Sequence, residues 1–401
     1  LRSPEEESMK ILITSDWYAP TLNGVVVSIL NLKHSLEERG HEVRVLTLSN
    51  SPRSYCRDGV THIGSFNASK IYPNARIRLA PARALLQDLI DWQPDIVHSQ
   101  CEFCTFFLAR KIAELSGAPL VHTYHTVYED YTHYFSPSER LGRRTMAAFA
   151  YWIGTQIDCY VAPTEKIRAL LDGYGVKCPI AVIPTGLDLS LFSASVAPEQ
   201  RSELRRSYGI ADDRIVLAAI GRLAAEKNAE ELLCYMADCR DLPLTLLLVG
   251  DGPNRAALET LAKKLELGDR AIFTGMVPHD KVGTYYHLGD VFVNASTSEA
   301  QGLTYNEALA AGLPALCRAD DVLDGVIENG INGWQYHDEA EFREKIEALV
   351  TDSALRARMS QAAQNSAAAF SKANFGARAE ALYLEQLRLA ANLRRRCVLA
   401  S

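Results

Sequence analysis

Short apolar runs that alternate with longer amphipathic segments are the feature that most limits how this chain can fold. In the first half, apolar runs predict strands at 10–15, 42–48, 95–98 and 119–123, and helical periodicity predicts helices at 24–39, 82–91 and 106–116. Neighbouring parallel strands need crossover helices of about this length. The pattern therefore predicts an α/β domain in which helices cover both faces of a parallel sheet.

The same alternation starts again after a joint that begins at Pro184. One more strand, at 181–183, precedes the joint, and further strands are predicted at 214–220, 244–249, 271–274, 291–294 and 314–317. We expect two Rossmann-like, doubly wound domains at 9–190 and 191–375, and a C-terminal helix within 376–401 that crosses back to the first domain. Where two such sheets face each other, their carboxyl ends border one cleft, and ligands are expected there.

Composition agrees with this organisation and excludes some functions. A chain of 401 residues that is 48% hydrophobic can bury two cores. The net charge of -7 gives no reason to expect nucleic acid. Nine cysteines, spread through strands and helices, fit free thiols in a reducing compartment. No apolar run reaches the roughly 18 residues that a bilayer span needs.

Two loops that follow predicted strands have the chemistry of phosphate sites. Asn23-Gly24 precedes the first helix, and Gly24 lets a ligand approach the helix N-terminus, where phosphate is favoured. Arg222 and Lys227 follow the strand at 214–220, and two cations there can neutralise a diphosphate. Taken alone, a turn such as the first is more often a structural loop, and the second is equally compatible with a solvated surface loop.

A third pair of turns has the character of a nucleobase site. Gly250 follows the strand at 244–249, and Met276 follows the strand at 271–274. Glycines at such strand ends leave main-chain amides and carbonyls open to a planar ring. Turns of this kind are common in doubly wound sheets, so the prediction depends on the other loops.

Two glutamates, Glu299 and Glu307, lie around a predicted helix start near Leu303. We expect Glu307 in or near the first turn, where the helix dipole keeps a carboxylate ionised and able to accept two sugar hydroxyls. One alternative is that Glu307 is an ordinary helix-start residue. The others are a metal site, which lacks partners with metal-ligand spacing, and the acid and base of a glycosidase. None of these alternatives explains the phosphate-like and base-like loops, so the ordered set predicts a nucleotide-sugar site.

The ordered set of motifs, from about Met9 to Phe375, resembles the retaining glycosyltransferases of family 4, which have the GT-B fold. The resemblance implies that Glu307 binds the ribose, that Glu299 binds the transferred sugar, and that Arg222 and Lys227 neutralise the diphosphate. It also implies donor contacts from Gly24, Gly250, Met276, Gly302, Leu303 and Thr304. Loss of the diphosphate would then need no metal and no other cofactor.

A narrower resemblance, to bacterial diacylglycerol glucosyltransferases, lies in the segments 122–134 and 298–305, with Gln301 and Thr304-Tyr305 as the distinguishing residues. It implies transfer of a hexose, glucose from UDP-glucose, to diacylglycerol. It gives His125 a catalytic contact with the sugar and places Asp16 near the donor or acceptor. Cys101 and Cys104 depart from the pattern beside Glu102-Phe103, which leaves no case for a redox motif.

The histidines of the same segment allow a different interpretation. His122 and His125, with Glu129 and Asp130, have the residue types of a metal site, but helical spacing is absent at a strand end. His133 follows in the same segment. The simpler interpretation is that His122 is a packed core histidine and that no metal binds.

A lipid acceptor requires contact with a membrane surface. Arg140, Arg143 and Arg144 precede the apolar residues Phe149, Tyr151 and Trp152, and this combination suits anionic lipid, as does a second basic group formed by Arg76, Arg78 and Arg83. Packing of the apolar residues in the core is an equal alternative. We therefore expect a cytoplasmic enzyme that is peripheral on the inner face of the cell membrane.

Three other functions stay open at this point. The nearest is a soluble family 4 enzyme that glycosylates a polysaccharide or small molecule. A nucleotide-sugar epimerase of the same architecture would act on the donor alone. An inactive binding module is disfavoured because both glutamates and both cations are present.

Overall fold

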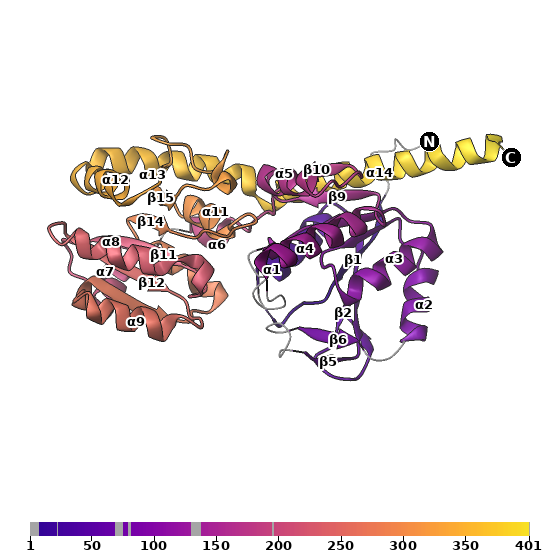
Figure 1. Ribbon diagram of the computed structural model, residues 1–401, viewed down its shortest axis with the longest axis horizontal. Coiled ribbons are helices and arrows are strands. Elements are labelled where there is room, and N and C mark those ends of the chain that lie inside the picture. Colours follow the sequence, from indigo (N-terminus) through magenta and orange to yellow (C-terminus); the bar gives the residue numbers. More distant parts are fainter. Residues whose placement is uncertain are drawn as a thin grey trace. The chain divides into compact units, whose positions relative to one another are not determined.

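The computed structural model describes residues 8–21, 23–68, 75–78, 82–129, 138–194 and 196–400. The chain folds into two compact units, which are Leu1–Gly186 with Lys372–Ser401, and Leu187–Ser371 (Figure 1). The predicted boundaries at 190/191 and 375/376 therefore move to 186/187 and 371/372. The second boundary moves because the last helix starts at Lys372 and already buries Phe375 in the core of the first unit.

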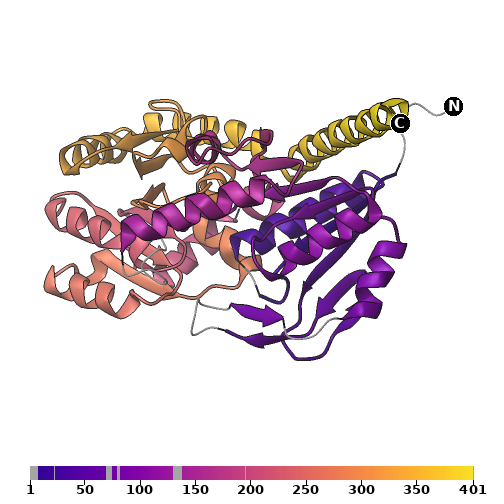
Figure 2. The same ribbon diagram turned by 45° about the vertical axis from the view of Figure 1, so that its right-hand side comes forward.

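The first unit is built on an eight-stranded sheet in the order β10-β9-β8-β7-β1-β2-β4-β3. Neighbouring strands are parallel except β3 and β4, which are antiparallel. The strands are β1 (Lys10–Ser15), β2 (Glu42–Leu48), β3 (Tyr55–Arg57), β4 (Val60–Ile63), β7 (Ile96–Ser99), β8 (Leu120–Thr123), β9 (Cys159–Ala162) and β10 (Ile180–Val182). Figure 2 shows them, indigo to magenta, with helices packed against the sheet.

The helices of the first unit are α1 (Gly24–Glu38), α2 (Arg83–Asp91), α3 (Cys104–Ser116), α4 (Glu139–Gly154), α5 (Glu165–Gly173) and α14 (Lys372–Ala400). Central strands of a parallel sheet are covered on both faces, so their residues form continuous apolar runs. In β1, every residue after Lys10 is buried. This is why the run at 10–15 was recognisable as a strand, and why α/β architecture followed from it.

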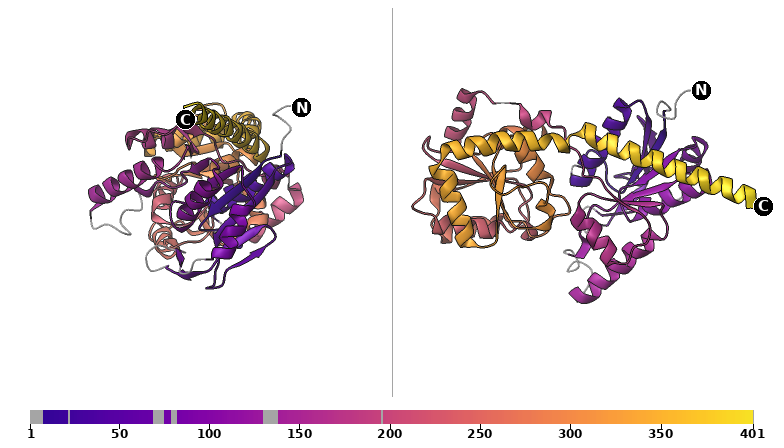
Figure 3. Two further views of the ribbon diagram at one scale, coloured as in Figure 1. Left: turned by 90° about the vertical axis from the view of Figure 1, so that its right-hand side faces the viewer. Right: turned by 90° about the horizontal axis from the view of Figure 1, so that it is seen from above.

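The predicted return of the C-terminal helix to the first unit is confirmed. The buried side chains Phe375, Ala379 and Tyr383 of α14 belong to the same core as α1 and β1. Glu380 forms an ion pair with Arg39 and accepts a hydrogen bond from His41 Nε2 at 2.9 Å, since His41 Nδ1 accepts from the Met9 amide. Figure 3 shows α14, in yellow, lying along the first unit.

The second unit contains a six-stranded parallel sheet in the order β13-β12-β11-β14-β15-β16. Its strands are β11 (Ile215–Ile220), β12 (Leu244–Val249), β13 (Ala271–Gly275), β14 (Val291–Asn294), β15 (Ala315–Arg318) and β16 (Gly333–Tyr336). Its helices are α6 (Ser190–Ser193), α7 (Pro198–Ser207), α8 (Ala229–Asp238), α9 (Arg255–Lys264), α10 (Val282–Tyr286), α11 (Leu303–Ala310), α12 (Glu339–Thr351) and α13 (Ser353–Ala367). The order changes direction at β11, next to β14, so this edge has the switch point at which ligands bind such sheets.

A small hairpin of the first unit was not predicted. Strands β5 (Ser65–Asn67) and β6 (Arg76–Arg78) pair antiparallel, and Phe66 lies directly opposite Ile77. Both apolar side chains are nearly half exposed. Three-residue strands carry too few residues for a period-2 pattern, which is why periodicity missed them.

The helices in the described ranges include none with the length and apolar character to cross a membrane.

Candidate active site

Glu299 and Lys227 form an ion pair at the carboxyl edge of the second sheet. Glu299 lies in the loop after β14, and Lys227 ends a short 3₁₀ helix, η2 (Ala225–Lys227), after β11. The Lys227 Nζ and Glu299 Oε1 atoms are 2.5 Å apart, and the Glu299 side chain is largely buried. The pair thus places a cation suited to phosphate beside a carboxylate suited to hydroxyl groups.

Hydrogen bonds hold the two loops together. The Ser296 hydroxyl and the Thr297 amide both donate to the carbonyl oxygen of Glu226, each at 3.2 Å. The residues predicted to contact sugar and diphosphate are therefore mutually positioned by the backbone of η2. Sequence alone indicated that both loops follow strands, but not that they touch.

Arg222 precedes η2 and forms an ion pair with Glu226. Its side chain is about half exposed. Each of the two predicted diphosphate cations thus has a carboxylate partner in the structure, Glu226 for Arg222 and Glu299 for Lys227. A diphosphate that binds here would compete with carboxylates for the same cations.

The expectation for Glu307 was wrong in one physical respect. Glu307 is the fifth residue of α11, beyond the first turn, and its carboxyl is buried and accepts a hydrogen bond from the Tyr286 hydroxyl at 2.7 Å. The dipole effect fades within the first turn. Burial instead raises the pKa of Glu307 to about 7, and the Tyr286 hydrogen bond opposes the rise. Near neutral pH the ligand-free carboxyl is therefore partly protonated.

The predicted donor-contacting residues Gly302, Leu303 and Thr304 lie at the N-terminal end of α11. Gly302 precedes the helix with φ +70, in the left-handed region that favours glycine. Leu303 and Thr304 are partly exposed, so their amides lie at the helix N-terminus, where an anion is favoured. Gly24 is likewise exposed at the start of α1, behind the capping side chain of Asn23.

Gly250 does not offer the open main-chain amide that was expected there. Its amide is not open to a ligand, because it donates to the Gly275 carbonyl at 3.1 Å. A Cβ at Gly250 would lie 2.0 Å from the Gly221 carbonyl oxygen, so the glycine is required for the close approach of the turns after β11 and β12. Met276 is 78% exposed in the neighbouring loop, and its role as a donor contact stays a prediction.

Asp16, predicted to lie near the donor or acceptor, has a structural role as well, and its part in catalysis stays a prediction. Its carboxylate accepts from the amides of Cys104 and Thr105, at 3.1 and 2.7 Å, and from the Thr105 hydroxyl at 2.6 Å. It therefore caps the N-terminus of α3 from the end of β1. Burial raises the pKa of the Asp16 carboxyl, and these hydrogen bonds oppose the rise. The cap also explains why α3 begins at Cys104 rather than at Phe106.

Alanine in place of Asp16 is expected to destabilise the protein by about 1–2 kcal/mol, because α3 loses its cap. Asparagine, which keeps one acceptor oxygen, should cost less. Urea unfolding of the three proteins measures both effects. Unchanged stability of the alanine variant, with activity lost, would instead assign Asp16 to the chemistry.

His125 lies where it was predicted, in the loop directly after β8. Its Nε2 is 2.6 Å from the Oε1 of Gln100. An amide oxygen only accepts, so Nε2 donates and Nδ1 carries the free lone pair of the neutral ring. Burial lowers the pKa of His125 to about 4, so the ring is neutral at physiological pH and able to accept a sugar hydroxyl.

Sequence reasoning missed Gln100, Glu102 and Tyr128 as neighbours of this histidine, and Tyr286 as the partner of Glu307. Gln100 and Glu102 are almost completely buried polar residues directly after β7. Two polar residues at the end of a strand were a signal of a site. The Cys101 and Cys104 spacing between and beside them is the more conspicuous pattern in the sequence.

The histidine-rich segment gives no metal cluster within the described residues. His122 is fully buried, and its ring packs edge-on against Phe106 and Tyr160. Asp130 and His133 lie outside the described residues. The prediction that no metal binds stays a prediction.

The apolar residues of α4 are divided between core and surface. Phe149 and Trp152 stack on each other, and Trp152 also contacts Phe106 and Phe107 of α3. Tyr151 remains exposed, and so does Leu141 near the start of the helix. Core packing therefore accounts for part of the aromatic pattern.

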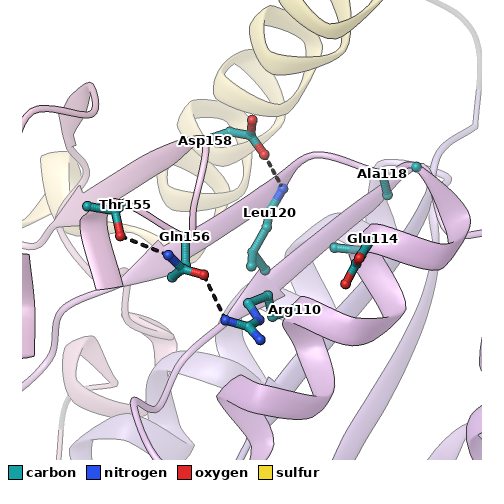
Figure 4. Close-up of a pocket in the computed structure, with 9 residues that line it drawn as sticks. Arg110, Glu114, Ala118, Leu120, Thr155, Gln156 and Asp158 are labelled. Atoms are coloured by element: carbon teal, nitrogen blue, oxygen red, sulfur yellow. Dashed lines mark hydrogen bonds between the residues drawn. The ribbon is translucent and has the colours of Figure 1, made fainter. Parts of the chain in front are cut away.

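Two hollows of the first unit differ in position. One, of about 560 Å³, lies at the amino ends of β8 and β9, where Asp158 accepts from the Leu120 amide and Arg110 donates to Gln156 (Figure 4). The other, of about 120 Å³, lies at the carboxyl edge and is lined by Asp16 to Thr21, with residues such as Asn50, His62 and Arg76. Only the second is at the edge where ligands bind sheets of this type.

Two family models match the chain. The model described as "Glycosyltransferase Family 4" matches residues 22–191, and the model described as "Glycosyl transferases group 1" matches residues 200–366. The alpha-monoglucosyldiacylglycerol synthases of Streptococcus pneumoniae and Acholeplasma laidlawii are each 33% identical to the chain. Both alignments cover 94% of this chain, with 86% of the first protein and 97% of the second.

Solved structures share the two-unit fold. HepE from Anabaena, in complex with UDP, has a TM-score of 0.71 at 19% identity, over 94% of this chain and 99% of that one. WaaG, a glycosyltransferase involved in lipopolysaccharide biosynthesis, has a TM-score of 0.68 at 20% identity, over 92% and 98%. At these identities the likeness shows the fold, which is GT-B.

Proposed function

We propose, because this chain belongs to glycosyltransferase family 4, that it transfers glucose from UDP-glucose to the free hydroxyl of 1,2-diacylglycerol and yields an α-glucosyl lipid. The Lys227–Glu299 pair, beside the N-terminus of α11, is the observation that carries the proposal. The two relatives named as alpha-monoglucosyldiacylglycerol synthases support the choice of glucose and of the lipid.

In this proposal the donor binds to the carboxyl edge of the second sheet. The diphosphate lies against Arg222, Lys227 and the first amides of α11, and the ribose hydroxyls donate to Glu307. Glu299 accepts from the hexose. Bond breaking leaves negative charge on the nucleoside diphosphate, and fixed cations stabilise that charge most where it develops. Arg222 and Lys227 thus perform the neutralisation for which other enzymes use a divalent cation.

The proposed transfer retains the configuration of the sugar. The acceptor hydroxyl attacks from the face that the diphosphate leaves, and a diphosphate oxygen takes the hydroxyl proton. His125, neutral and with Nδ1 free to accept, holds a hexose hydroxyl. This route requires no protein nucleophile.

The acceptor half of the proposal is supported by the first unit. The hollow of about 120 Å³ that is lined by Asp16 to Thr21 has the size that a glycerol head group needs, and its lining includes polar and aromatic side chains. The β5–β6 hairpin exposes Phe66 and Ile77, and α4 exposes Leu141 beside Arg140, Arg143 and Arg144. Exposed apolar side chains with cations suit the interface of an anionic membrane. We place the protein at the cytoplasmic face of the membrane.

One predicted membrane cation is used internally. The Arg76 guanidinium donates to the Ser49 carbonyl, at 2.9 Å, and to the Ser65 hydroxyl, at 2.7 Å. It therefore fastens the hairpin to the loop after β2. Arg78 and Arg83 stay in the proposed membrane surface.

A donor panel with diacylglycerol in anionic vesicles tests the function. UDP-glucose is expected to give a lipid product whose glucose is α-linked, detected by chromatography and nuclear magnetic resonance. The rate should be the same with a chelator present. A protein that consumes no nucleotide sugar with lipid, but glycosylates a soluble acceptor, would assign it to the other branch of the family.

A further inference from the structure

Two loops of the first unit are joined side by side at the carboxyl edge of its sheet. The segment after β7 carries Gln100 and Glu102, and the loop after β8 carries His125 and Tyr128. Gln100 accepts from His125 at 2.6 Å, and Glu102 Oε2 accepts from the Tyr128 hydroxyl at 2.5 Å. The loop that presents His125 is thus attached at two points.

Glu102 is more deeply placed than an ordinary hydrogen-bond partner. It is 2% exposed, and its other oxygen, Oε1, has no hydrogen bond among the described residues. That oxygen lies 3.5 Å from His122 Nε2, which itself has no hydrogen bond in the same part of the chain. A buried polar atom without a partner costs roughly 1–3 kcal/mol. The carboxylate therefore has one oxygen that is hydrogen-bonded to Tyr128 and one that faces the His122 ring without a hydrogen bond.

Within the described residues, the Glu102 side chain accepts one hydrogen bond, from the Tyr128 hydroxyl. The Tyr128 ring is also edge-on to Phe103 and Tyr124, each at 5.9 Å between ring centroids. Edge-on aromatic contacts are not directional in the way a hydrogen bond is, so the hydrogen bond to Glu102 is the contact that fixes the hydroxyl end of the ring. The Tyr128 end of the loop that bears His125 is therefore held by Glu102, and Gln100 holds the His125 end.

We propose that Glu102 is a positioning residue for sugar transfer, which acts through Tyr128 to hold the loop at 124–129 and so to fix His125. The inference rests on the proposed function, in which His125 contacts the hexose. Misplacement of a contact by about 1 Å can cost about 100-fold in rate. Because the donor cations and Glu307 lie in the other unit, loss of this attachment should lower kcat and leave nucleotide binding unchanged.

Four variants test the proposal in the full chain. Glu102→Ala and Tyr128→Phe, which each remove the hydrogen bond, should lower kcat at least about tenfold, with KM for the donor within about twofold. Glu102→Gln, whose amide oxygen still accepts from Tyr128, should keep kcat within about threefold. Tyr124→Phe is the matched control. It removes a buried hydroxyl that has no partner among the described residues, and kcat should not change.

Hydrogen–deuterium exchange gives a measure that does not depend on activity. Peptides covering 124–129 should exchange faster in Glu102→Ala and Tyr128→Phe than in the wild type, Glu102→Gln or Tyr124→Phe. Unchanged exchange, or unchanged kcat in an active enzyme, would overturn the proposal. If the wild type transfers no sugar to any acceptor, the proposed function fails, while exchange still decides whether Glu102 holds the loop.

Discussion

Glutamine in place of Glu307 is expected to stabilise the ligand-free protein at pH 8 by up to about 3 kcal/mol while weakening nucleotide binding. Burial raises the pKa of Glu307 from 4.5 to about 7, and each unit of difference corresponds to about 1.4 kcal/mol. The folded state therefore holds the proton more tightly than the unfolded state. Stability falls as pH rises from about 4.5, and the full loss is present above about 7. A neutral amide avoids this loss.

Urea unfolding at pH 5 and pH 8 measures the effect. The gain from Glu307→Gln should be large at pH 8 and small at pH 5. Glu203→Gln is the control, since Glu203 is exposed on α7 and should show little change at either pH. If Glu307→Gln and the wild type are equally stable at pH 8, burial of the ionised carboxylate does not lower the free energy of unfolding.

The same substitution should change how nucleotide binding depends on pH. Only the ionised carboxylate accepts from both ribose hydroxyls, so the affinity of the wild type for UDP should fall as the pH drops below about 7. The glutamine variant should bind more weakly at pH 8 and lose this dependence. Calorimetric titration with UDP at several pH values measures both. Glu307 would then lower the stability of the free protein and raise its affinity for the nucleotide, which is a common compromise between stability and function.

Alanine in place of Lys227 is expected to lower kcat about 100-fold, the usual size of the loss when one group that stabilises developing charge is removed. Two effects combine. The departing diphosphate loses a cation, and Glu299 loses the partner that lies 2.5 Å away in the free protein. Steady-state kinetics with the substrates of the proposed reaction measure the change.

Two further variants separate these effects. Lys263→Ala, on the exposed face of α9, is the matched control and should keep wild-type kcat. The double variant Lys227→Ala with Glu299→Gln, compared with both single variants, gives the coupling energy of the pair in urea unfolding. A kcat of Lys227→Ala within about threefold of the wild type would show that other groups neutralise the diphosphate.

Local pattern was sufficient where a single element decides its own structure. Buried parallel strands are continuous apolar runs, so β1, β2, β11, β12 and β14 were predicted within a residue or two. The start of α3 was missed because its cap, Asp16, is 88 residues away in the chain. The β5–β6 hairpin was missed because its strands have three residues each, too few to show a period-2 pattern.

The sequence by itself determined the two-unit α/β architecture, the order of the strand-end loops, and the charges that those loops carry. These properties depend on residue type and on spacing along the chain. Only the tertiary structure decided that Lys227 meets Glu299, that Asp16 caps a helix, that Glu307 is buried with a raised pKa, and that Glu102 holds the loop of His125. Burial and hydrogen-bond partners depend on residues that are distant in the chain. The same chemical group, a carboxylate, therefore binds a ligand, caps a helix or holds a loop according to the residues that pack against it.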